Sequence, residues 1–224
     1  MNMFEKRLIE IKNKLSLQAG TVESMLQNAL NGLFESERDF CEKVFRQEES
    51  VNKLEIAIDE LCIMTLALNQ PEAGHLRMII TALKNNNDLE RIGDHAVNIC
   101  ESALELMSYV NKKDYILLPR MAGVAMEMFR KAVRSFVTDD TVLAAEVNDL
   151  DDTVDEMEQQ ILKRSISIMA AEAGYISLEY HIIRIAQNLE RIADLSTNIA
   201  EETIFMKEGR IVKHGENETQ GKRE

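Results

Sequence analysis

An eleven-residue motif occurs twice in this chain, 100 residues apart. It reads LERIGDHAVNI at 89–99 and LERIADLSTNI at 189–199, and seven of the eleven positions are identical. The identical positions include Glu, Asp and Asn, whose side chains offer oxygen atoms to a cation. All-oxygen ligand sets favour hard or borderline ions such as Mg²⁺, Ca²⁺, Mn²⁺ and iron. Two related cation-binding surfaces are therefore one reading of this motif.

On a helix, residues three or four apart share a face, so the oxygen-bearing residues of each motif fall on one stripe. The first stripe contains Glu90, Asp94, Asn98 and Glu101. The second contains Glu190, Asp194, Asn198 and Glu201. The apolar residues of the first copy point to the opposite side. His95 lies between the two faces, where a structural role is favoured over a ligand role.

The preceding helix of each half carries a second acidic stripe. In the first half it contains Glu48, Asn52, Glu55 and Asp59, and in the second half Asp151, Asp155, Glu158 and Leu162. Helices joined by a short turn are neighbours, so we expect the stripes of each half to face one another. Like charges placed this way repel, and a bound cation would offset the repulsion. The alternative is a solvated acidic face with Arg91 and Arg191 as counter-charges.

Several kinds of chemistry are not indicated by the sequence. It has no ExxH pair of the kind that binds two irons in helical bundles. It also lacks a P-loop, a GxGxxG motif and a Ser/His/Asp signature. The net charge is −13, without a cluster of Lys or Arg, which argues against nucleic-acid binding. We therefore expect a protein that works by binding and is not an enzyme.

The pattern of apolar residues predicts six long helices. Their expected ranges are 3–34, a helix that ends near 68 after a turn at 35–39, 72–110, 119–137, a helix that ends near 171 after N-cap residues at 138–141, and 177–206. Breaks at 69–74 and 171–175 occupy matching places in the two halves. The predicted fold is all-α, with two pseudo-repeated antiparallel three-helix bundles at 1–110 and 111–208 and a disordered polar tail at 209–224.

The first motif also defines a predicted core stripe, which contains Ile92, Ala96, Ile99, Ala103 and Leu106. The three cysteines are odd in number and scattered, which predicts reduced, buried thiols in a cytoplasmic protein. No apolar run is long enough to span a bilayer, and the N-terminus lacks the apolar stretch of a signal peptide.

These residues resemble the PhoU family of phosphate-specific transport system accessory proteins. The resemblance rests on ERIGDHAVNIC at 90–100 and ERIADLSTNIAE at 190–201, supported by VNKLEIAID at 51–59 and VDEMEQQI at 154–161. It extends over the chain as far as about residue 208. It implies a PhoU-like pair of three-helix bundles in a cytoplasmic, homodimeric regulator without enzymatic activity, peripheral to the membrane only through its partners. Its implied partners are the ATPase of the Pst phosphate transporter and a PhoR-type sensor kinase, and its implied role is negative regulation of phosphate uptake and of the phosphate-starvation response.

The resemblance also implies bound iron, zinc or another divalent ion such as magnesium, held by paired E(D)xxxD motifs. Carried over to this chain, the first set is Glu55 and Asp59 with Glu90 and Asp94, and the second is Asp151 and Asp155 with Glu190 and Asp194. Asn98, Glu101, Asn198 and Glu201 would complete the sets. Leu162 stands where the first stripe has Asp59, so we expect the second site to hold fewer ions or to bind them more weakly.

Two other functions remain open from the sequence. A metal-storing or redox protein would use the same acidic residues, although the missing ExxH pairs argue against it. A dimeric helical scaffold without metal would need only the apolar faces.

Overall fold

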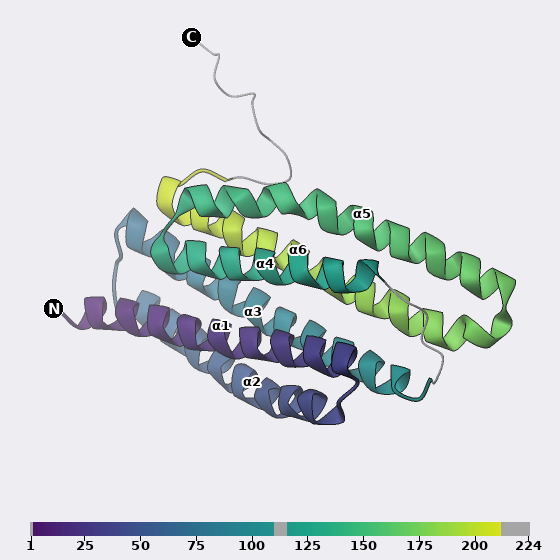
Figure 1. The fold of residues 1–224 in the computed structure, drawn as a ribbon. Coiled ribbons are helices and arrows are strands. Elements are labelled where there is room, and N and C mark those ends of the chain that lie inside the picture. Colours follow the sequence, from purple (N-terminus) through teal and green to yellow (C-terminus); the bar gives the residue numbers. More distant parts are fainter. Residues whose placement is uncertain (1, 110–115, 212–224) are drawn as a thin grey trace, which may run out of the picture.

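The computed structural model describes residues 2–109 and 116–211, and six α-helices make up most of these residues (Figure 1). The helices are α1 (Met3–Glu35), α2 (Arg38–Ala67), α3 (Ala73–Leu106), α4 (Leu117–Thr138), α5 (Thr141–Ala171) and α6 (Ile176–Glu208). A short 3₁₀ helix, η1 (Ala173–Tyr175), precedes α6. The predicted all-α fold is confirmed. The proposed division at 110/111 and most of the predicted disordered tail lie outside the described residues.

Local side-chain chemistry explains several helix ends. Asp140 caps α5, because its Oδ1 accepts hydrogen bonds from the backbone N–H groups of Val142 (3.1 Å) and Leu143 (3.0 Å). Helix α4 begins at Leu117, two residues before the start expected at Pro119. The proline is tolerated in the first turn because the N–H groups there have no partner within the helix. Helix α6 ends at Glu208 and is followed by Gly209, whose φ of 69° favours glycine.

One predicted boundary is wrong. The third helix was expected to reach 110, but α3 ends at Leu106. The chain tightens there into i→i+3 turns, in which the N–H of Ser108 donates to the carbonyl of Glu105 and that of Tyr109 to Leu106. Tight turns of this kind are common where α-helices end, and the apolar periodicity of the sequence does not reveal them.

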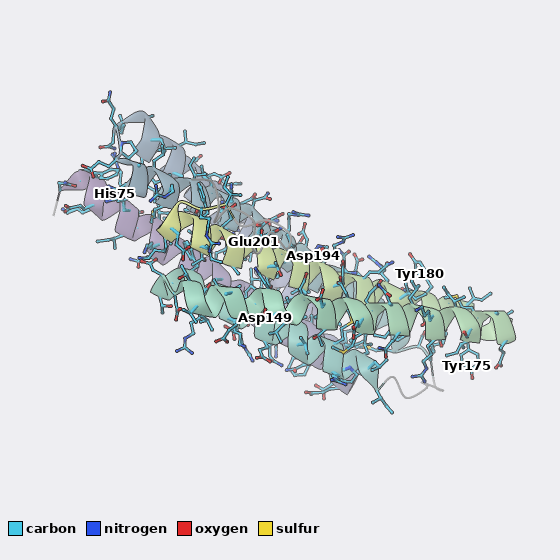
Figure 2. The ribbon with its side chains drawn as sticks, turned by 90° about the horizontal axis from the view of Figure 1, so that it is seen from above. His75, Asp149, Tyr175, Tyr180, Asp194 and Glu201 are labelled. Carbon is cyan, nitrogen blue, oxygen red and sulfur yellow. The ribbon has the colours of Figure 1, made fainter. Side chains whose placement is uncertain are left out.

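Helices α3 and α6 lie side by side at the centre of the molecule (Figure 1). Helices α1 and α2 pack on α3, α4 and α5 pack on α6, and α1 also contacts α4. Viewed from above, His75 near the start of α3 and Tyr175 just before α6 lie at opposite ends, so the two central helices are antiparallel (Figure 2). The fold is therefore two antiparallel three-helix bundles joined along α3 and α6.

Most buried positions of one half have a buried counterpart in the other. Val44 and Val51 on α2 correspond to Val147 and Val154 on α5, 103 residues later, and all four are buried. On α3 and α6 the separation is 100 residues. The predicted core stripe is also confirmed, since each of its five members is at most 5% exposed. Within the described residues, no helix is long and apolar enough to cross a membrane.

One pair of core positions differs between the halves in a compensating way. A Cβ atom added at Gly32 would lie 2.7 Å from Sγ of Cys41, far inside normal contact. The equivalent positions in the second half are Ser135 and Ala144, both buried. The first half thus combines a glycine with a larger neighbour, and the second half combines a serine with a smaller one. All three cysteines are buried and free, as expected.

Candidate functional site

Four carboxylates from α2 and α3 form what we call the first acidic cluster: Glu48 and Glu55 on α2, and Glu90 and Asp94 on α3. Partial burial, followed by the charges of Asp94 and Glu101, raises the pKa of Glu48. Burial also raises the pKa of Glu55 and of Glu90, and Asp94 adds to both effects. Within the described residues, no Lys or Arg forms an ion pair with any of the four.

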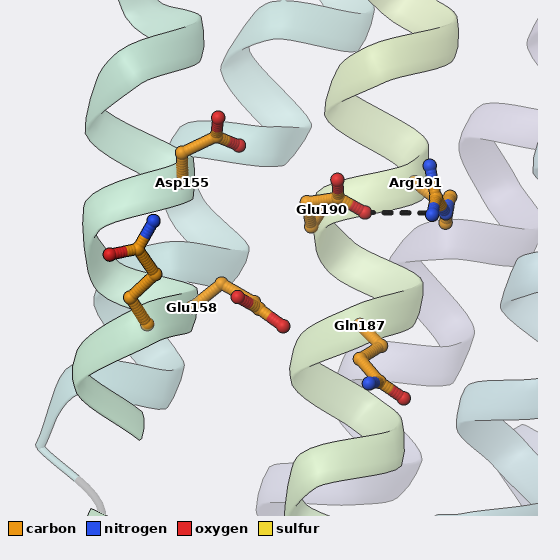
Figure 3. A pocket seen from close by; sticks show the side chains of 6 residues that line it. Asp155, Glu158, Gln187, Glu190 and Arg191 are labelled. Atoms are coloured by element: carbon orange, nitrogen blue, oxygen red, sulfur yellow. Dashed lines mark ion pairs between the residues drawn. The ribbon is translucent and has the colours of Figure 1, made fainter. Parts of the chain in front are cut away.

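Five carboxylates form the second acidic cluster, between α5 and α6. Asp151, Asp155 and Glu158 come from α5, and Glu190 and Asp194 come from α6. Part of this cluster lines an open groove with a volume of ≈ 420 Å³ (Figure 3). The groove is lined by Asp155, Glu158, Gln159, Gln187, Glu190 and Arg191.

Repulsion and burial are also visible in the second cluster. Burial, then the charge of Asp194, raises the pKa of Glu190 to about 7, although Arg191 acts in the opposite direction. Burial and neighbouring carboxylates also raise the pKa of Asp151 and of Asp155. A carboxyl group with a raised pKa keeps its proton to a higher pH than an ordinary surface carboxyl group does.

Arg191 provides a positive charge within the second cluster. Its Nη1 lies 2.9 Å from Oδ2 of Asp194, and its Nε lies 3.4 Å from Oε2 of Glu190. Figure 3 shows the guanidinium beside Glu190 at the edge of the groove. Arg191 is therefore a counter-charge of this cluster, which is one part of the sequence-based alternative of a solvated acidic face.

The structure places the two E(D)xxxD pairs of α2 and α5 out of register with one another. Asp151 and Asp155 correspond to Glu48 and Asn52, 103 residues earlier, and not to Glu55 and Asp59. Asp59 accepts a hydrogen bond from Nδ2 of Asn86 at 2.8 Å, which ties its side chain to a buried residue of α3. The ligand role predicted for Asp59 stays a prediction.

Two acidic residues were not among the predicted ligands but belong to the clusters. The charge of Asp94 helps to raise the pKa of Glu48. Glu158 lines the same groove as Glu190. Both lie on the acidic stripes visible in the sequence, seven residues apart from a partner on the same helix. Aligning the buried valines of α2 and α5 would have identified them.

Asn98 and Glu101 are held by the neighbouring repeat. Arg184 of α6 donates from Nη2 to Oδ1 of Asn98 at 3.0 Å and to Oε2 of Glu101 at 2.6 Å. In the second half, Asn198 and Glu201 lie one and two turns beyond Asp194 on α6, and both are partly buried (Figure 2 labels Asp194 and Glu201). The proposed contribution of these four residues to metal binding remains a prediction.

His95 takes part in the contact between the repeats. Its Nδ1 lies 2.8 Å from Oδ1 of Asn188, and the Nδ2 of Asn188 donates to the carbonyl of Arg184. Burial lowers the pKa of His95, which favours the neutral ring. These contacts favour the structural role that the sequence suggested.

The donor chemistry of both clusters suits a hard cation, because every ligand is a carboxylate oxygen. In the described part of the chain, however, no three His, Cys, Asp or Glu side chains gather as closely as the ligands of one metal ion do. The carboxylates are spread along each helix pair. Holding a metal ion therefore requires these side chains to turn toward one another.

Comparison with known proteins places this arrangement in a family. The model of the PhoU domain matches twice, at residues 15–103 and 118–203. The chain is 36% identical over 214 residues to a phosphate-specific transport system accessory protein PhoU homolog of Aquifex aeolicus, covering 96% of each chain. It is 28% identical to the phosphate-specific transport system accessory protein PhoU of Escherichia coli, covering 94% of this chain and 88% of that protein.

Solved structures agree with the sequence relatives. The crystal structure of PhoU from Pseudomonas aeruginosa superposes with a TM-score of 0.90 at 31% identity, covering 93% of this chain and all of that one (100%). The PhoU structure from Streptococcus pneumoniae, a phosphate transport system regulatory protein, shares the fold with a TM-score of 0.87 at 24% identity. Because the family model covers most of the chain, in two copies that correspond to the two helical bundles, this chain belongs to the PhoU family.

Proposed function

We propose that this protein is a cytoplasmic negative regulator of phosphate uptake and of the phosphate-starvation response. It acts by binding two partners, the ATPase of a Pst-type phosphate transporter and a PhoR-type sensor kinase, and it works as a homodimer without catalysing a reaction. Its association with the membrane is indirect, through these partners.

The observation that carries this proposal is the full-length match to phosphate-specific transport system accessory proteins. The 36% identical relative is covered over 96% of its length, so the match is not confined to one shared bundle. The long, acidic helical faces also suit a protein that docks on other proteins. Electrostatic complementarity of such surfaces sets partner choice and association rate.

We further propose that the two acidic clusters bind divalent or iron ions. This proposal is supported by the carboxylates that gather in both clusters, where burial and then the charge of a neighbouring aspartate raise the pKa of Glu90 and of Glu190. A bound metal ion would supply positive charge at these sites. The protein's own part is to hold the carboxylates on two rigid neighbouring helices, so that cation binding changes the charge of a docking face.

A gene deletion tests the regulatory proposal. Loss of the protein should switch on phosphate-starvation genes in phosphate-rich medium, measured with a reporter fused to a starvation-induced promoter. Reintroducing the wild-type gene should restore repression, and an empty vector is the control. Repression that continues after the deletion would reject the proposal.

Elemental analysis tests the metal proposal separately. Protein purified without chelators or a His tag should contain a divalent metal or iron, and a variant with Asp94→Ala and Asp194→Ala should contain less. Absence of metal from the wild type would favour the metal-free scaffold. Oxidase activity in iron-loaded protein, lost in the same variant, would favour the metal-storing or redox function.

A further inference from the structure

The two repeats are so alike that a helix of one repeat could pack into the bundle of the other. Most buried residues of α1 and α2 recur 103 residues later on α4 and α5, and most of those of α3 recur 100 residues later on α6. Chains with repeated units are prone to misassembly of this kind during folding. Each bundle therefore needs contacts that its own helices make and that the equivalent helices of the other repeat cannot make.

The first contact of this kind joins α1 to α2, and its counterpart joins α4 to α5. Gly32 leaves room for Sγ of Cys41, because a Cβ atom at position 32 would lie 2.7 Å from that sulfur. The second repeat has Ser135 and Ala144 at these places, and all four residues are buried. Packing α4 on α2 would press Ser135 against Cys41, which overfills the space. Packing α1 on α5 would place Gly32 beside Ala144, which leaves a void.

The second contact joins α2 to α3 and is polar in the first repeat only. Asn86 is fully buried, and its Nδ2 donates to Oδ1 of Asp59 at 2.8 Å and to the carbonyl of Glu55 at 2.9 Å. The equivalent residues of the second repeat, Ala186 and Leu162, are apolar. Packing α3 on α5 would take the carboxylate away from the buried amide and leave it a backbone carbonyl alone. A buried amide that loses a hydrogen bond makes such a packing less stable.

We propose that these two pairing contacts keep the helices of each repeat together while the chain folds. One contact joins the first and second helices of a repeat and the other joins the second and third, so each three-helix bundle is specified throughout. The inference depends neither on metal binding nor on the proposed regulatory function. It explains the difference between Asp59 and Leu162 by packing, whereas the sequence-based expectation for this pair concerned metal ions.

Refolding of the full-length chain from urea tests the inference, in excess chelator so that metal binding plays no part. In the uniform variant, both repeats carry the pairing contacts of the second repeat, through Gly32→Ser, Cys41→Ala, Asp59→Leu and Asn86→Ala. Each bundle keeps complementary contacts, but pairing across repeats is no longer penalised. The misassembled fraction should rise about 5-fold or more, the factor that corresponds to the smallest usual overpacking penalty. It is measured as the amplitude of slow refolding and as oligomers in size-exclusion chromatography.

The matched control restores the difference between the repeats in exchanged form. This exchanged variant adds four changes to the uniform variant: Ser135→Gly, Ala144→Cys, Leu162→Asp and Ala186→Asn. It carries twice as many substitutions, yet it should refold with as little misassembly as the wild type. Misassembly as frequent as in the uniform variant would show that the substitutions disturb folding locally, and would overturn the inference.

A second uniform variant makes the test independent of one background. It carries only the four changes in the second repeat, so both halves have the contacts of the first repeat, and it should misassemble as well. Refolding of either uniform variant as cleanly as the wild type would overturn the inference. Equilibrium urea unfolding shows whether each variant reaches a native state. A uniform variant without one would show that the contacts are not interchangeable between the bundles, which also contradicts the inference.

Discussion

Glu190 is partly buried and lies beside another carboxylate, Asp194, so its ionised form is opposed twice. These effects raise its pKa to about 7, from an ordinary value of 4.5. Between pH 4.5 and about pH 7, Glu190 therefore keeps a proton in the folded protein that it has lost in the unfolded chain. The stabilisation that results from this difference is fully present below pH 4.5 and is lost as the pH rises through 7.

The first prediction follows from this linkage. In metal-free protein, the free energy of unfolding should fall between pH 5 and pH 8, and Glu190→Gln should reduce the fall by about 2 kcal/mol, because each pKa unit corresponds to about 1.4 kcal/mol. Urea unfolding at the two pH values in excess chelator measures the effect. An equal pH dependence in the wild type and the variant would contradict it.

The second prediction concerns Gly32 and Cys41. Gly32→Ser should destabilise the protein by about 1–3 kcal/mol, because the new Cβ would lie 2.7 Å from Sγ of Cys41. Adding Cys41→Ala should recover most of that loss, since the second repeat packs with Ser135 and Ala144 at the same places. Thermal or urea unfolding gives the comparison. If the losses of stability in the two single variants simply add in the double variant, the smaller residue at position 41 does not make room for the larger one at position 32.

At the scale of the helices, the two repeats also differ in how they start their second helix. Asp140 caps α5 through two backbone N–H groups, whereas its counterpart Glu37 at the start of α2 makes no side-chain cap hydrogen bond. The backbone of both residues is extended, so the difference lies in the side chain. A glutamate is one methylene longer than the aspartate that fits this turn.

The third prediction uses this pair as its own control. Asp140→Ala should cost about 1 kcal/mol of stability, the usual value of an N-cap, and Glu37→Ala should cost little. Glu37→Asp should stabilise the protein by a few tenths of a kcal/mol or more by supplying the missing cap. Chemical denaturation of the three variants decides the matter, and equal losses in both alanine variants would speak against the capping difference.

The elements themselves were largely predictable, because long helices with regular apolar spacing leave a strong periodic signal. The acidic stripes were predictable for the same reason. The contact of Arg184 with Asn98 and Glu101 was not, because it depends on the antiparallel register of α3 and α6, which no local pattern encodes. The out-of-register motifs of α2 and α5 show a related limit, since matching E(D)xxxD strings gave a different alignment from the buried valines.

At the scale of the whole molecule, the acidic clusters lie on the outer sides of the helical pairs and leave the core intact. Asp94 is exposed and the side chain of Asp194 is 38% exposed, so neither contributes to apolar packing. The sequence placed both residues off the core, and the structure confirms this placement. Charge on these faces can therefore change without a change in fold.

The fourth prediction follows from this separation. The variant with Asp94→Ala and Asp194→Ala should keep the helical content and melting temperature of the chelated wild type but should bind less metal. A metal ion at 100 times its dissociation constant should stabilise the wild type by about 2.7 kcal/mol and the variant by much less. Circular dichroism melts with and without Mn²⁺ provide both measurements. Lost helicity in the chelated variant would contradict the off-core placement.

The antiparallel contact of α3 with α6 has the form of an interface between two copies of one protein related by a twofold axis. In evolutionary terms, the chain resembles an ancestral dimer whose subunits became covalently fused. Fusion makes their association independent of protein concentration. It also lets one copy change while the other keeps its original residue, whereas in a true homodimer every mutation appears twice. Gly32 with Ser135, and Cys41 with Ala144, are differences that a fused pair can carry and a homodimer cannot.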